Sequence, residues 1–145
     1  MDYVIVKYLH MIGILVLFAS LVLEHSLLRP EVSAATIKKL AIVDGIYGFS
    51  ALIVMLAGLM LWFQVGKGSA FYTPNHIFHL KVGLFALVGL ASIYPTAFFL
   101  KHRKTQAESI AIPKAIIMIV RCEMLAILVL PLFAVMMAQG LGLPH

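Results

Sequence analysis

Four long apolar runs constrain the fold of this chain more than any other feature. They cover about residues 4–26, 40–63, 77–100 and 114–138. Each run has the length of about 20 residues that an α-helix needs to cross a bilayer. The runs are continuous rather than alternating, which favours helices over the strands of a closed barrel. We therefore predict an all-α fold, in which residues 1–145 form a single transmembrane domain, an integral membrane four-helix bundle.

The composition agrees with a membrane protein. Hydrophobic residues make up 63% of the chain and charged residues 12%, whereas soluble domains have about 45–50% and about 25%. The formal net charge is +5, but the basic residues lie in short connections between apolar runs and not in an aromatic-rich basic stripe. This pattern predicts membrane lipid as a partner and no binding of nucleic acid.

The distribution of lysine and arginine predicts the orientation of the bundle. The second connection carries only Lys67, whereas the first and third are rich in basic residues. These are Arg29, Lys38, Lys39, Lys101, Arg103 and Lys104. Because basic connections stay in the cytoplasm, we expect both termini on the outer, periplasmic side. The predicted localisation is multi-pass, in the inner membrane of a bacterial cell.

Several ionisable residues fall inside the predicted spans, where such residues mark functional sites by default. In the outer half, His10 lies about 9 Å below the membrane edge, at 1.5 Å per residue. Neutral imidazole is the commonest protein metal ligand, so His10 is a candidate ligand for a metal or for haem iron. The alternative is a neutral histidine that forms a hydrogen bond with a neighbouring helix.

A second iron ligand would have to come from another helix. His79 near the start of the third run is one candidate, and Met55 on the second run matches His10 in depth. Methionine is also common as ordinary packing in helix bundles. Lys81 could extend to the outer surface, or it could hold a carboxylate such as a haem propionate. The predicted metal ligands are therefore His10 and His79, and the cofactor-binding set adds Met55 and Lys81.

A second polar group is expected in the inner half of the membrane. It consists of Glu24, Asp44, Arg121 and Glu123. Arg121 is predicted to pair with one of these carboxylates, either as a structural ion pair or with a role towards substrate. The motifs of zinc proteases, nucleophile-elbow hydrolases and phosphate-binding loops do not occur in the sequence.

Two segments resemble the bacterial membrane-embedded protoporphyrinogen oxidases, the four-helix HemJ-type proteins. "YLHMIGILVLFASLVLEHSLLRP" is similar to their first helix and "HIFHLKVGLFALVGLASIYPT" to their third, with His79 and Lys81 in the places of a family histidine and lysine. The resemblance implies that His10 is an axial ligand of haem b and that Lys81 lies near the tetrapyrrole. The chain also resembles an uncharacterised bacterial family of four-helix membrane proteins of unknown function.

These observations lead to one main functional prediction and two alternatives. The main one is a haem b-binding oxidoreductase that acts on a protoporphyrinogen-like tetrapyrrole or transfers electrons to or from a quinone. Its candidate catalytic residues are Lys81, Arg121 and Glu123. The first alternative is a transporter or channel subunit, working as a homo-oligomer, that uses the inner acid-base group. The second is an accessory membrane protein without chemistry.

Overall fold

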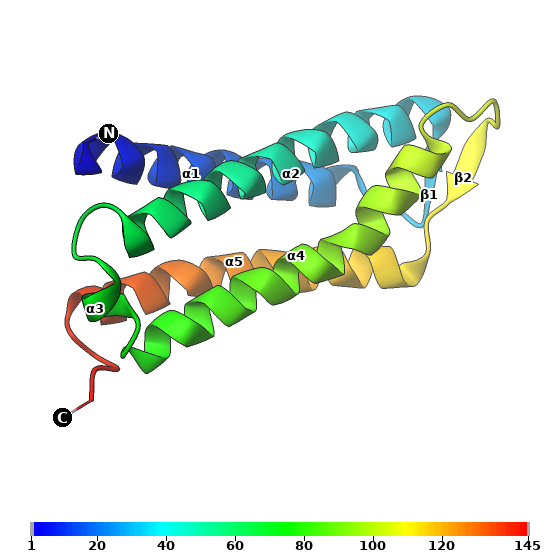
Figure 1. Ribbon diagram of the computed structural model, residues 1–145. Helices are drawn as coiled ribbons and strands as arrows, with labels where there is room; N and C mark the ends of the chain where they lie inside the picture. The colour runs from blue at the N-terminus through cyan, green and yellow to red at the C-terminus, as the bar shows by residue number, and fades with distance from the viewer. Residues whose placement is uncertain (1, 145) are drawn as a thin grey trace.

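Four long helices form the body of the protein in the computed structural model, which describes residues 2–144 (Figure 1). They are α1 (Tyr3–Leu27), α2 (Ala34–Phe63), α4 (His76–His102) and α5 (Lys114–Ala138). Each is long and apolar enough to cross a membrane, with a mean hydropathy of 1.8 to 2.4 in its most apolar stretch. The prediction of four helices able to span a membrane is therefore confirmed. The orientation of the bundle in the membrane stays a prediction.

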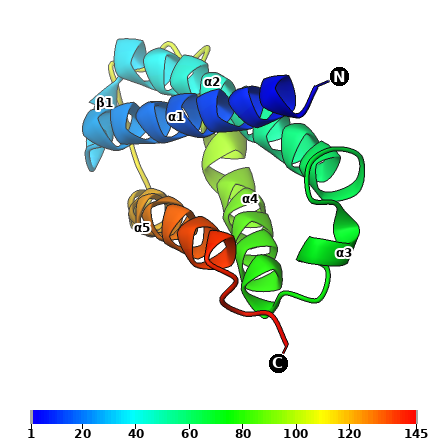
Figure 2. The same cartoon turned by 90° about the vertical axis from the view of Figure 1, so that its left-hand side faces the viewer.

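The helices pack as two antiparallel pairs. The most extensive contact is between α1 and α2, followed by that between α4 and α5, and the pairs meet where α2 contacts α4 and α1 contacts α5. Figures 1 and 2 show both chain ends at one end of the bundle, together with the short helix α3 (Ser69–Tyr72). We call this the terminal end. The first and third connections lie together at the opposite end.

Those two connections form a small β-ribbon, which the sequence did not predict. Strands β1 (Glu31–Ser33) and β2 (Ser109–Ala111) pair antiparallel, with Val32 opposite Ile110. Val32 is buried. The ribbon forms because the bundle brings two extended connections side by side, where each satisfies backbone groups of the other. We call this the ribbon end.

Most helix boundaries agree with the sequence, and α5 begins and ends where it was predicted. The exception is α2, which begins at Ala34 and not near residue 40. The cause is Ser33, whose side-chain oxygen accepts a hydrogen bond of 3.2 Å from the backbone N–H of Thr36. A serine in this position satisfies one of the free N–H groups at a helix start, so the helix extends back to the ribbon.

The tightest packing lies near the ribbon end. Six hydrophobic side chains there have no exposed surface: Leu21, Ile37, Leu40, Phe99, Ile116 and Val120. In the most apolar stretch of each long helix, only 22–28% of the residues are buried inside the protein. Most of the other residues of these stretches are apolar and lie half-buried or exposed at the protein surface, where lipid must cover them.

Candidate functional site

The His10 side chain lies between α1 and α2 near the terminal end. Its Nδ1 is 3.0 Å from the backbone carbonyl oxygen of Val54. A carbonyl oxygen can only accept a hydrogen bond, so Nδ1 must carry a proton and donate it. In the neutral ring this leaves the lone pair of Nε2 free. The hydrogen bond expected of a structural histidine is present, and it is also the kind of bond that orients a metal-binding histidine.

Two glycines make room for this arrangement. A Cβ atom at Gly13 would lie 2.8 Å from Cγ2 of Val54, and one at Gly58 would lie 3.3 Å from Cε1 of His10. Both distances are shorter than ordinary van der Waals contact. Small residues of this kind let membrane helices approach closely, and here they allow the imidazole to reach the backbone of α2.

Lys81 approaches the same region from α4. Its side chain is half-buried, and it lies close enough to His10 for its charge to act on the imidazole ring. Within residues 2–144 the ammonium has no hydrogen bond or ion pair. An unpaired ammonium inside a membrane domain is costly, and a bound anion would offset that cost. The two residues, which the sequence placed in one predicted site, therefore lie in the same part of the bundle.

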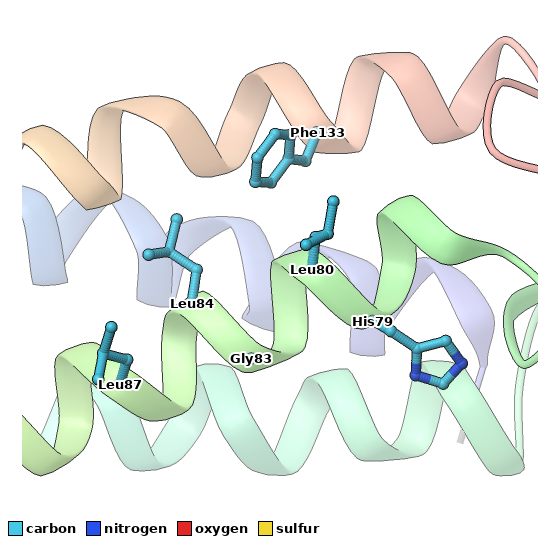
Figure 3. A pocket seen from close by; sticks show the side chains of 6 residues that line it. All are labelled: His79, Leu80, Gly83, Leu84, Leu87 and Phe133. Atoms are coloured by element: carbon cyan, nitrogen blue, oxygen red, sulfur yellow. The ribbon is translucent and has the colours of Figure 1, made fainter.

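The two candidates for a second iron ligand are not brought to His10. The His79 side chain is exposed, and its Nε2 lies 2.7 Å from the carbonyl oxygen of Thr73. Figure 3 shows its ring directed away from Phe133 of α5. Met55 is 44% exposed, because it follows Val54 by one residue and so points about 100° away from it around α2. The predicted pairing of His10 with either residue has no support in this arrangement.

A cluster of three carboxyl side chains lies inside the half of the bundle nearer the ribbon. Glu24 of α1, Asp44 of α2 and Glu123 of α5 are 1%, 4% and 3% exposed. Oε2 of Glu24 is buried and has no hydrogen-bond partner. Among the residues described, no group of three or more His, Cys, Asp or Glu residues has the geometry of a metal site. We call these three residues the carboxyl cluster.

Arg121 does not join this cluster, which corrects the predicted ion pair with Asp44, Glu123 or Glu24. Its side chain is exposed on the surface of α5, and no ion pair involves it within residues 2–144. The reason is helical geometry: Arg121 and Glu123 are two residues apart, which places them about 200° apart around the helix. With Glu123 inside, Arg121 must face outwards.

Ser92 of α4 connects the cluster to α2. Its Oγ lies 2.7 Å from the carbonyl oxygen of Val88, 2.6 Å from Oε1 of Glu123 and 3.2 Å from the hydroxyl of Tyr47. A hydroxyl has one proton and two lone pairs. Ser92 is placed to donate this proton either to Val88 or to Glu123. All three contacts are satisfied together when Ser92 donates to Val88 while Tyr47 and a neutral, protonated Glu123 donate to Ser92. Tyr47 and Ser92 were not predicted as site residues, because a single hydroxyl side chain in an apolar run does not indicate a functional site.

A groove runs along the surface between α4 and α5. It contains two cavities of about 360 Å³ each, which share Leu84 and Leu87 as lining residues. The first begins beside His79 and includes Phe133 (Figure 3). The second reaches Glu123. We call the two cavities together the α4–α5 groove.

Fold and polar interior together define a multi-pass helical membrane protein with ionisable groups inside the bundle. The chain belongs to the predicted membrane protein family DUF2214, whose model matches residues 3–142. A search of curated proteins found no match, and a search of solved structures found none either. The family confirms the membrane class. The resemblance to protoporphyrinogen oxidases and the binding of haem stay predictions.

Proposed function

We propose that this protein binds haem b in the membrane and exchanges electrons with a lipid-soluble partner, either a protoporphyrinogen-like tetrapyrrole or a quinone. The observation that carries the proposal is the His10 imidazole, which the carbonyl of Val54 orients and whose Nε2 stays available beside the half-buried Lys81. When bound, haem would supply one-electron chemistry, while the protein would supply the ligand, the charge and the apolar surroundings.

The residues around His10 suit one side of a haem. Nε2 of His10 would be the iron ligand, and the absence of a side chain at Gly58 lets the ring lie close to α2. The ammonium of Lys81 would bind a propionate, since it has no anionic partner within residues 2–144. His79 and Met55 face elsewhere. We therefore propose a single protein ligand, His10, and not the pair of ligands expected from the sequence.

A second function, proton or ion transport, has its own supporting observation. The carboxyl cluster holds three buried acids from three helices without a compensating cation among the residues described. Intramembrane acids of this kind occur in proton pathways. Four helices are few for a transport path, so this function would require a homo-oligomer. It would assign no role to His10.

Absorption spectroscopy of the protein purified in mild detergent tests the main proposal. With haem supplied during expression, we expect a Soret band, and α and β bands after reduction with dithionite. His10→Ala should lose these bands, and His79→Ala is the matched control that should keep them, because His79 is exposed and bonded to its own loop. Lys81→Ala should weaken haem retention.

Two results would count against haem binding at His10. One is a colourless wild-type protein after haem supplementation, and the other is a His10→Ala spectrum identical to the wild type. A colourless protein that carries a pH-dependent proton flux in liposomes, abolished by Glu123→Leu, would establish transport instead. A colourless protein without proton flux would favour the third function, an accessory membrane protein without chemistry.

A further inference from the structure

The α4–α5 groove has the shape of a binding site for a long lipid-soluble molecule. Its two cavities are adjacent, since Leu84 and Leu87 line both of them. From His79 to Ala91, which both line it, α4 advances about 18 Å at 1.5 Å per residue. The walls are apolar along most of this length, and both helices belong to the membrane-spanning set. A ligand would therefore enter from the lipid and lie along the helices.

The inner end of the groove is different, because the acidic residue Glu123 lines it. This side chain is 3% exposed, and its Oε1 is engaged by Ser92 at 2.6 Å. When Glu123 is a neutral acid with its proton on Oε1, all three contacts of Ser92 are satisfied together. Oε2 is then the carbonyl oxygen of the acid, and it has no hydrogen-bond partner within residues 2–144. The groove thus ends in a hydrogen-bond acceptor.

The depth of this acceptor restricts the class of ligand. Glu123 lies about 14 Å along α5 from Lys114, where the helix begins. Phospholipid headgroups stay at the membrane surface, so a phospholipid could place only an acyl chain here and would leave the acceptor unpaired. A ligand that fits must carry its hydrogen-bond donor within the hydrocarbon core, next to an apolar tail.

We propose that the α4–α5 groove binds a quinol-type lipid, an aromatic ring with a hydroxyl group and an apolar tail. The ring hydroxyl donates a hydrogen bond to Oε2 of Glu123, and the tail lies against Leu84 and Leu87 towards Phe133. This inference gives the lipid-soluble partner of the proposed function a binding site. Only the transfer of electrons to or from the bound molecule rests on the proposed function. Binding itself requires no haem.

The test is a titration of the purified protein with 2-heptyl-4-hydroxyquinoline N-oxide, a fluorescent quinol analogue with an apolar tail, following the change in its fluorescence. We expect saturable binding with one molecule per chain. Glu123→Leu should weaken binding roughly tenfold, because it removes the acceptor. Glu123→Gln should bind like the wild type, since an amide can donate to Ser92 and still offer a carbonyl oxygen to the ring.

The groove itself is tested by filling it. Ala91→Phe or Ala126→Phe, which lie on opposite walls, should each abolish binding. Ala97→Phe is the matched control, because Ala97 is exposed on α4 and lies outside the lining of the groove. Thermal unfolding of each variant, followed by circular dichroism, verifies that it folds. The test is valid if at least one of the two wall variants has the wild-type melting temperature.

Three results would overturn the proposal. The first is equal binding by all variants, which would mean that the probe only partitions into the detergent. The second is a loss in Glu123→Gln as large as in Glu123→Leu, because it would exclude a neutral acid as the acceptor. The third is unchanged binding in folded wall variants. The spectrum of the same sample reports haem separately, so a failure of haem binding and a failure of quinol binding can be distinguished.

Discussion

Nδ1 of His10 on α1 donates a hydrogen bond of 3.0 Å to the carbonyl oxygen of Val54 on α2. This bond joins the two helices with the most extensive contact in the bundle. The carbonyl also accepts from its own helix ladder, so the imidazole adds a second bond without breaking α2. The position of the ring therefore depends on how closely the two helices approach.

That dependence predicts the effect of Gly58→Ala. The new Cβ would lie 3.3 Å from Cε1 of His10, and the ring cannot move away without lengthening its bond to Val54. We expect a loss of about 1 kcal/mol in the free energy of unfolding, and weaker haem retention if His10 is the ligand. Thermal unfolding in detergent measures the first effect and the Soret absorbance the second.

Gly48→Ala is the control for that experiment. A Cβ at Gly48 meets nothing within 4 Å, so alanine should stabilise the helix by about 0.5–1 kcal/mol. If Gly58→Ala stabilises the protein as much as Gly48→Ala does, the ring is not held as described.

The hydrogen-bond network around Ser92 predicts that Tyr47→Phe destabilises the protein. Tyr47 is 4% exposed, and its hydroxyl lies 3.2 Å from Oγ of Ser92. The variant removes one donor and should cost about 0.5–1.5 kcal/mol of unfolding free energy. Tyr94→Phe is the matched control, since Tyr94 is 46% exposed on α4. Equal melting temperatures for the two variants would show that the Tyr47 contact contributes nothing.

Asn75 is predicted to have two separable roles at the start of α4. Its Oδ1 accepts from the backbone N–H groups of Ile77 and Phe78, and its Nδ2 donates to the carbonyl oxygen of Leu141. Asn75→Ala should lose both the helix cap and the link to the C-terminal turn, with a cost of about 0.5–2 kcal/mol from the cap.

Asn75→Ser separates the two roles, because serine also caps helices but cannot reach Leu141 as a donor. We expect it to keep most of the thermal stability and still show faster proteolysis within residues 139–144. Proteolysis at the wild-type rate in both variants would mean that Nδ2 does not hold the C-terminal turn.

The orientation of the bundle can be tested with single cysteines in a Cys122→Ala background. Ser69→Cys lies at the terminal end and Gln106→Cys at the ribbon end, and both positions are exposed. Because the basic residues gather at the ribbon end, that end should face the cytoplasm. A membrane-impermeant maleimide should label Ser69→Cys in intact cells and Gln106→Cys only after lysis. The reverse pattern would invert the predicted topology.

The four membrane spans could be predicted because the hydropathy of a segment depends on its own residues and not on the segments that pack against it. A run of about 20 apolar residues must find lipid or a core, and all four runs became helices. The start of α2 was predicted too late, because the apolar run begins later in the chain than the cap at Ser33. The ribbon could not be predicted, because neither strand has a pattern of its own and each exists only where the bundle places it beside the other.

The depth of each ionisable residue along its helix was determined by the sequence alone, and this was enough to place His10 and Lys81 in the same half of the membrane. Only the tertiary structure decided which way each side chain faces. In a soluble helix the polar stripe shows the outer face, but in lipid the core and the outer surface are both apolar, so the sequence carries no such stripe. That is why Arg121 was expected inside with Glu123 and lies outside, and why Ser92 and Tyr47 were found only in the folded bundle.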